Sequence, residues 1–246
     1  MSLKYQTEEE PRPEDLQHGE PDAVRPGYPY YTIILIAGTA AVFIAQIAVG
    51  LDQSAKLAGF VKPAFRLNHE YWRILTGATT HGSLIHIGMN SYAFYNIGRI
   101  LEMLSNRAHL AIVFLLSALG GGVLSLIFMP DGTSVGASGG IVGLIGYLAI
   151  YSFRRRQFIS PEFRKNILIN IGFMLVFGLV LYQVIDNFGH IGGLITGAIY
   201  GLLQIPTDPH ADPRQAESGV EFAGLAAVGT YIAACGFSIL LILRIV

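Results

Sequence analysis

Seven stretches of apolar residues divide the chain, and each is long enough to form a helix across a lipid bilayer. Such a helix needs about 20 predominantly apolar residues. Four stretches are almost uninterrupted: about 31–50, 108–129, 167–185 and 222–243. Three more are apolar but contain His, Ser, Asn and many Gly residues: about 78–100, 136–153 and 188–205. The pattern predicts seven membrane-spanning helices.

The polar segments between these stretches define the expected domains. Residues 1–28 are acidic and contain several prolines, and because such a composition buries too little apolar surface to fold, we expect a disordered cytoplasmic tail. Residues 29–205 then form a core of six spans. A polar linker, 206–221, makes the seventh helix, within 222–246, look like an appendage to that core.

Composition agrees with a membrane protein. Hydrophobic residues make up 52% of the chain and charged residues 13%, whereas soluble domains carry roughly 25% charged residues. The net charge of −1 gives no reason to expect nucleic acid as a partner. The single cysteine, Cys235, lies in the last apolar stretch and cannot form an internal disulfide.

The distribution of basic residues predicts the orientation. Cytoplasmic loops carry an excess of Lys and Arg, and the Arg154–Arg156 run after the fourth span is the strongest marker. We therefore expect a cytoplasmic N-terminus and an outer C-terminus, in a plasma (inner) membrane. Between the first two spans, the long loop of about 51–77 contains the only tryptophan, Trp72. Two interpretations of Trp72 stay open, an interfacial anchor or part of an ordered functional loop.

Polar residues within the spans are the candidates for chemistry, because ionisable groups in a membrane are rare and usually functional. His86 and Asn90 are four residues apart and share one helical face, whereas His81 would lie about 140° round the same helix and face elsewhere. A zinc site needs about three convergent ligands, and no H-E-x-x-H motif is present. The sequence therefore does not favour a metal site.

Glycine stripes predict which spans touch. Gly193 and Gly197 belong to a stripe with one glycine every four residues in the sixth span, and Gly139 and Gly143 form a matching stripe in the fourth. Helices in lipid associate through such small faces. We therefore expect these two spans to lie in contact along much of their length.

Ser138 can be interpreted as a packing residue or as a nucleophile. The second, fourth and sixth spans run in the same direction, and His86, Ser138 and His190 each fall in the outer half of one of them. A serine within hydrogen-bond reach of a histidine is the minimum for an activated nucleophile. No predicted span contains Asp or Glu, which argues against a proton-relay transporter.

Three motifs resemble those of the rhomboid intramembrane serine proteases. They are H-x-x-x-x-H-x-x-x-N at residues 81–90, G-A-S-G at 136–139 and G-H-x-x-G-x-x-x-G at 189–197, and E-x-W-R at 70–73 is also similar. The resemblance covers about residues 31–205. It implies an all-α polytopic membrane protein with a rhomboid-like six-helix bundle plus one C-terminal transmembrane helix (6+1).

The resemblance also implies a role for each matching residue. Ser138 would be the nucleophile, His190 the general base and then acid, and His86 and Asn90 the oxyanion hole together with the Ser138 amide. His81 would be a structural hydrogen-bonding residue. Further structural support would come from the other motif residues: Glu70, Trp72, Arg73, Gly136, Gly139, Gly143, Gly193 and Gly197.

The implied reaction is cleavage of transmembrane or juxtamembrane segments of single-span or polytopic membrane proteins in the bilayer, without a cofactor. One position departs from the family, in which an aromatic residue often follows the nucleophile by four positions; here it is Val142. We therefore expect a slow enzyme. Two alternatives stay open, a catalytically weak or inactive client-binding protein of the same fold and a small-solute transporter.

Overall fold

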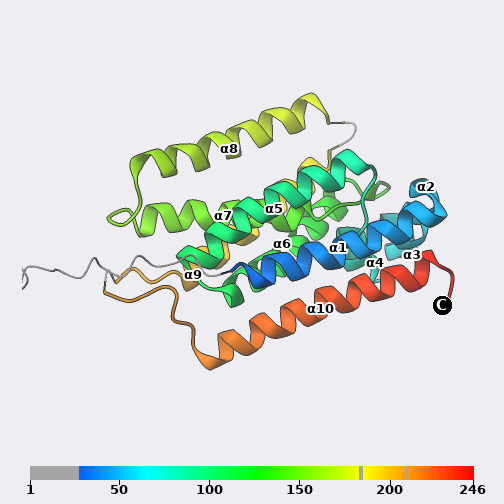
Figure 1. The fold of residues 1–246 in the computed structure, drawn as a ribbon. Helices are drawn as coiled ribbons and strands as arrows, with labels where there is room; N and C mark the ends of the chain where they lie inside the picture. Colours follow the sequence, from blue (N-terminus) through cyan, green and yellow to red (C-terminus); the bar gives the residue numbers. More distant parts are fainter. Residues whose placement is uncertain (1–27, 183–184, 209) are drawn as a thin grey trace, which may run out of the picture.

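A computed structural model describes residues 28–182, 185–208 and 210–246. Within these residues, seven long helices lie side by side in a bundle (Figure 1). They are α1 (Tyr30–Val49), α5 (Leu84–Leu104), α6 (Arg107–Phe128), α7 (Ser138–Arg154), α8 (Pro161–Val180), α9 (Asn187–Gln204) and α10 (Ser218–Ile242). Each corresponds to one predicted apolar stretch, and the all-α fold is confirmed. The expected disordered tail falls almost entirely outside the described residues.

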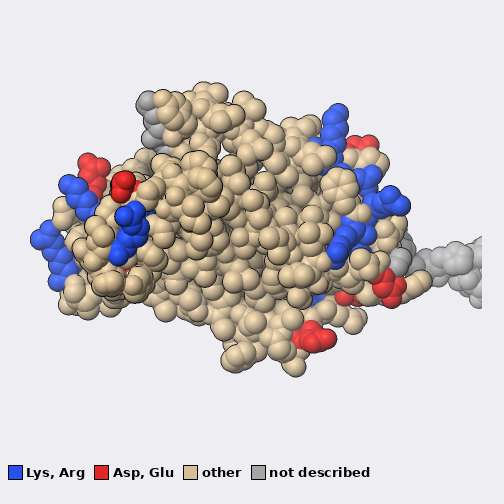
Figure 2. Space-filling model, turned by 180° about the vertical axis from the view of Figure 1, so that it is seen from behind, with Lys and Arg blue, Asp and Glu red and all other residues tan. Residues whose placement is uncertain are grey.

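Charged residues gather at the two ends of the bundle. Figure 2 shows blue and red side chains at both ends and a broad band between them without charges on this face. Four of the described helices, α1, α6, α8 and α10, are long and apolar enough to cross a bilayer. The other three long helices carry the His, Asn, Ser and Gly residues noted above. The protein is therefore an integral membrane protein.

The centre of the bundle is formed by α6, α7 and α9, which pack closely through small residues. A methyl group at Gly193 would overlap the carbonyl oxygen of Gly139, and one at Gly197 would overlap that of Gly143. The predicted contact between the two glycine stripes is thus confirmed. It brings the backbones of α7 and α9 closer together than helices with larger side chains could approach.

Gly197→Ala is expected to destabilise the protein, because the new methyl group forces α9 away from Gly143. Overpacking of this kind lowers the free energy of unfolding by about 1–3 kcal/mol. The matched control is Gly236→Ala on α10, where an added methyl group meets no atom within 4 Å. Thermal unfolding in detergent measures both variants, and equal stability of the two would contradict a close α7–α9 contact.

The loop between α1 and α5 is ordered. It contains α2 (Leu51–Ala58), β1 (Phe60–Val61), α3 (Lys62–Leu67) and α4 (Arg73–Thr79). Strand β1 pairs antiparallel with β2 (Thr133–Ser134), with Phe60 opposite Ser134. This pairing attaches the loop to the segment that leads into α7, and thus to the position of Ser138.

The E-x-W-R residues hold this loop together. Arg73 is 8% exposed, forms an ion pair with Glu70 at 2.5 Å and donates hydrogen bonds to two loop carbonyl groups, including that of Gly59 at 2.9 Å. Trp72 is 41% exposed and packs edge-to-face on Phe237 of α10. Trp72 therefore lies on an ordered loop.

The seventh helix is not an appendage, and this expectation was wrong. Helix α10 packs along α1 and α6 and also reaches α2 and α4 (Figure 1). The linker before it is fixed as well, because Asn106 donates a hydrogen bond to the carbonyl of Arg214 and Arg155 donates one to that of Asp208. Side chains at the helix ends thus pair with the polar backbone of the linker, which leaves α10 no freedom to stand apart.

Candidate active site

Ser138 and His190 are in direct contact. The distance from His190 Nε2 to Ser138 Oγ is 2.8 Å. Ser138 is the first residue of α7, and His190 lies in the first turn of α9, so the glycine contact between these helices sets their separation. Both side chains are half-buried. A serine hydroxyl held this way can give its proton to the imidazole as it attacks an electrophile.

A tight turn precedes Ser138. Gly136 has a φ of 121° and donates its N–H to the carbonyl of Gly77 at 2.9 Å. A side chain at Gly136 would collide with the His86 ring, 2.8 Å away, and approach the Asn90 amide. Glycine is therefore required here for both its conformation and its size. His86 and Asn90 consequently lie beside the turn that leads into the nucleophile position.

The N-terminus of α7 adds a further polar element. The first N–H groups of a helix have no partner within it, and the helix dipole makes this end partially positive. The backbone amide of Ser138 belongs to this end of α7. An anion that forms next to Ser138 Oγ would therefore meet a favourable electrostatic environment.

His81 does not face away from His86 and Asn90, and this expectation was wrong. Its Nε2 lies 2.9 Å from Asn90 Nδ2, and its ring meets the His86 ring edge-on, with 4.9 Å between centroids. The helical wheel does not apply, because α5 begins at Leu84 after the N-cap Ser83. The extended backbone before the cap turns the His81 side chain back toward α5.

Asp186 is a site residue that the sequence analysis did not select. It caps α9 by accepting the Gly189 N–H at 2.8 Å. Its other carboxylate oxygen accepts hydrogen bonds at 2.5 Å from Ser125 of α6 and Ser134 of β2. Asp186 therefore ties the start of α9 to the two neighbouring elements. The available signal was an aspartate directly before an apolar helix, a preferred N-cap residue.

Lys62 lies fully buried close to this carboxylate. Among the described residues its Nζ has no hydrogen-bond partner. Burial lowers the pKa of the Lys62 ammonium group, and the negative charge of Asp186 opposes this effect.

A cavity of about 50 Å³ opens next to the Ser138–His190 pair. A water molecule needs about 10–15 Å³ of such space, so the cavity has room for water beside the hydroxyl group. The lining combines apolar and polar side chains: Phe60, Ile74, Ser134, Ser138, Asp186 and His190.

The His190 ring nitrogen that does not contact Ser138 lacks a hydrogen bond to any described residue. His190 Nδ1 is buried and has no hydrogen-bond partner among the described residues. Val142, which follows Ser138 by four positions, is 5% exposed. In the described part of the chain, no three His, Cys, Asp or Glu side chains are grouped so that they could hold a metal ion.

The chain is similar to several known proteins. Over 174 residues the chain is 30% identical to "Rhomboid protease GluP" of Bacillus subtilis (strain 168), which covers 70% of this chain and 34% of that protein. It is 33% identical over 137 residues to "RHOMBOID-like protein 6, mitochondrial" of Arabidopsis thaliana, covering 55% of this chain and 44% of that protein.

"Inactive rhomboid protein 1" of Papio anubis is 28% identical over 158 residues, which cover 63% of this chain and 18% of that protein. The chain thus spans less than half the length of each of these three relatives. A family model of the Rhomboid domain matches residues 68–207, more than half of the chain. The chain therefore belongs to the rhomboid family.

Proposed function

We propose that the protein is an intramembrane serine endopeptidase that cleaves transmembrane or juxtamembrane segments of other membrane proteins. The observation that carries the proposal is the 2.8 Å contact between Ser138 Oγ and His190 Nε2, beside a cavity with room for water. A relative named a rhomboid protease supports it. A relative named an inactive rhomboid protein makes a test of activity necessary.

The reaction proceeds by acyl transfer. Ser138 Oγ attacks the scissile carbonyl carbon while His190 Nε2 accepts the hydroxyl proton, and a tetrahedral oxyanion forms. The C–N bond then breaks as His190 returns the proton to the leaving amine, which leaves an acyl-enzyme. Water attacks this ester with His190 again as base, and Ser138 is released with its proton. Because a protonated imidazole cannot act as the base, activity falls on acidification.

The oxyanion is stabilised by His86, Asn90 and the backbone N–H of Ser138. The placement of His86 and Asn90 around Gly136 supports these roles, and so does the positive end of α7. Preorganised donors of this kind act where negative charge develops in the transition state.

His86→Ala is expected to lower kcat by about 10²–10³-fold, the usual cost of losing one oxyanion donor. The control is Asn96→Ala on the same helix, because the Asn96 amide lies exposed and bonds to a carbonyl of its own helix. Initial cleavage rates at saturating substrate give kcat for both variants. A His86→Ala enzyme as fast as the control would remove His86 from the oxyanion hole.

His190 depends mainly on Ser138 for its orientation. Its Nδ1 atom has no hydrogen-bond partner among the described residues, and Val142 offers only an aliphatic side chain. The ring is therefore less constrained than it would be with a third polar group bonded to it. A base that spends less time correctly oriented transfers protons less often. We therefore expect slow turnover.

Substrates are single-span or polytopic membrane proteins that enter from the bilayer, and no soluble cofactor takes part. The charged ends of the bundle (Figure 2) support a transverse position in the membrane. We place the N-terminus in the cytoplasm, the C-terminus outside and the protein in the plasma (inner) membrane, on the excess of basic residues on one side. Residues 29–205 form the catalytic core and 206–221 the linker to the last helix.

Purified protein reconstituted in liposomes with a generic single-span substrate tests the proposal. We expect cleavage at a bond in or next to the membrane span. Stable binding of the substrate without cleavage would favour the client-binding alternative, which the inactive relative makes the second candidate. Flux of a small solute without any cleavage would favour a transporter, and either result would overturn the proposed activity.

A further inference from the structure

Residues 77–81, the end of α4 and the two residues that follow it, lie beside the candidate site, and Gly77 and Ala78 line its cavity. The carbonyl of Gly77 accepts the N–H of Gly136 at 2.9 Å, and Gly136 holds the turn two residues before Ser138. The position of Gly77 therefore determines where this turn lies. It also affects the placement of the Ser138 amide relative to His86 and Asn90, which surround Gly136.

Helix α10 holds the next two residues of this segment. Tyr231 Oη donates a hydrogen bond to the carbonyl of Ala78 at 3.2 Å. Ser238 Oγ and Thr79 Oγ1 are 2.8 Å apart and hydrogen-bonded. Tyr231, Thr79 and Ser238 are fully buried. Three successive residues are thus fixed, one to the turn before Ser138 and two to α10.

The same segment is also held by α1. Gln46 accepts the His81 N–H at 2.9 Å and donates to the His81 carbonyl at 3.1 Å. Thr39 of α1 lies 2.9 Å from Tyr231 Oη and can donate to it while Tyr231 donates to Ala78. Helices α1 and α10 therefore form a continuous polar support behind residues 77–81.

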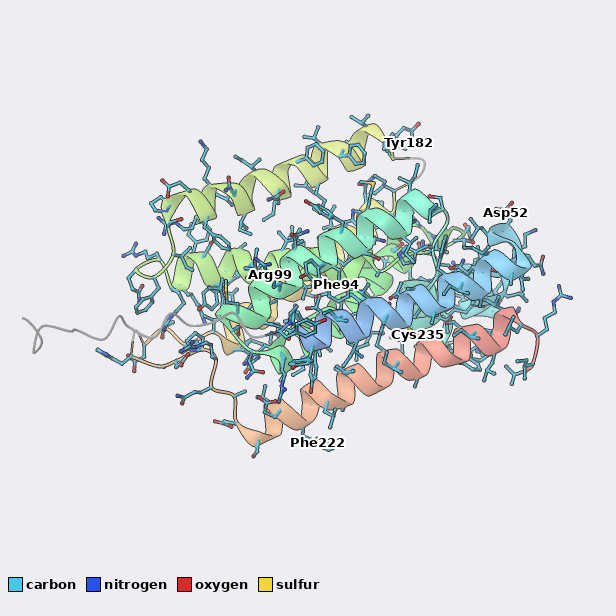
Figure 3. The ribbon with its side chains drawn as sticks, viewed as in Figure 1. Asp52, Phe94, Arg99, Tyr182, Phe222 and Cys235 are labelled. Atoms are coloured by element: carbon cyan, nitrogen blue, oxygen red, sulfur yellow. The ribbon has the colours of Figure 1, made fainter. Side chains whose placement is uncertain are left out.

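Packing alone does not require these polar groups. Elsewhere α10 meets α1 through apolar and small residues, since Gly38 faces Ile232 and Cys235, and Figure 3 shows Cys235 on α10 in the part that runs beside α1. A buried hydroxyl is costly unless it is paired. Tyr231 directs its hydroxyl group to Ala78. Ser238 Oγ lies against Thr79 and can also donate to the carbonyl of Ala234 in its own helix. The two contacts with Ala78 and Thr79 fix the register of α10 against this segment.

We infer that Tyr231 and Ser238 are positioning residues for catalysis: they hold residues 77–79, and through the Gly77–Gly136 hydrogen bond they hold the turn that places the oxyanion-binding groups. This inference rests on the proposed function. It assigns the seventh helix a part in transition-state stabilisation, although none of its residues lines the cavity beside Ser138 and His190.

The test compares Tyr231→Phe and Ser238→Ala with wild type in the full-length purified protein. Each substitution removes one hydroxyl and leaves the side-chain packing nearly intact. Active sites are counted with a fluorophosphonate, so that kcat refers to folded enzyme. We expect kcat per site to fall about three- to tenfold in each variant, the range for loss of one hydrogen bond, with KM unchanged.

Two further variants separate positioning from general stability. Ser238→Thr keeps the hydroxyl and is expected to retain kcat within about twofold of wild type. This change is smaller than the one expected from the loss of a hydrogen bond. Thr230→Ala removes a hydroxyl from the exposed face of the same helix and is expected to match wild type. Equal losses in Ser238→Thr and Ser238→Ala, or unchanged kcat per site in both Tyr231→Phe and Ser238→Ala, would overturn the inference.

Hydrogen exchange of the Gly136 amide provides a readout that does not depend on cleavage. The double variant Tyr231→Phe/Ser238→Ala is expected to exchange this amide several-fold faster than wild type, because the Gly77 carbonyl is held less firmly. Unchanged exchange would show that α10 does not hold the turn. If wild type cleaved no substrate, the proposed function would fail, and the exchange measurement would still decide whether α10 has this positioning role.

Discussion

Replacing Ser138 by alanine is expected to lower the rate of substrate cleavage by more than about 10⁴-fold. The substitution removes the oxygen that attacks the scissile carbonyl and that bonds to His190 Nε2. The fold should survive, because alanine at the first position of α7 fits a space that already holds serine. Cleavage of a single-span substrate in liposomes measures the loss.

Ser117→Ala is the matched control for this experiment. Ser117 lies fully buried on α6, and its hydroxyl has no hydrogen-bond partner among the described residues. Its removal should therefore leave cleavage close to the wild-type rate. Cleavage by Ser138→Ala at the rate of Ser117→Ala would show that Ser138 is not the nucleophile.

His190→Ala is expected to lower cleavage by more than about 10³-fold, because the base that deprotonates Ser138 is lost and the serine hydroxyl is a weak nucleophile on its own. Combined with Ser138→Ala, it should add little further loss. Groups that act as one unit give strongly non-additive effects, so the double variant distinguishes a dyad from two independent contributions.

His69→Asn serves as the control for loss of an imidazole. His69 is exposed in the loop between α3 and α4 and has a φ of 60°, a conformation that asparagine tolerates. We expect wild-type cleavage from this variant. A His190→Ala enzyme with comparable activity would exclude His190 as the base.

Much of this fold can be predicted from local patterns. Apolar stretches of bilayer length indicate the seven long helices, because a membrane-spanning helix can be recognised from the composition of its own residues. The glycines of α7 and α9 also predict their contact, since small residues at a four-residue spacing mark a face for close packing. From that contact follows the approach of Ser138 and His190, a distance that the structure gives as 2.8 Å.

The positions that escaped prediction depend on irregular backbone or on distant partners. His81 was placed by helical geometry, but the helix begins after it, at Leu84. Asp186 was not selected from the sequence, because its bonds to Ser125 and Ser134 join residues more than 50 positions apart. A helical wheel describes neither case.

The packing of the seventh helix is the largest difference between the structure and the sequence-based predictions. A polar linker before α10 suggested independence, since linkers usually separate units that share few contacts. The linker is instead bound by side chains such as Asn106, and Tyr231 and Ser238 of α10 pair with residues of α4. The sequence signal for this packing was the presence of the hydroxyl groups of Tyr231 and Ser238 in an otherwise apolar helix.

Mass spectrometry of the fluorophosphonate-treated wild-type protein tests the central claim most directly. If Ser138 is a nucleophile activated by His190, one phosphonyl group per chain should be found, on Ser138. The modified protein should no longer cleave substrate, and His190→Ala should react far more slowly. An adduct on another residue, or cleavage that continues after Ser138 is fully modified, would contradict the account.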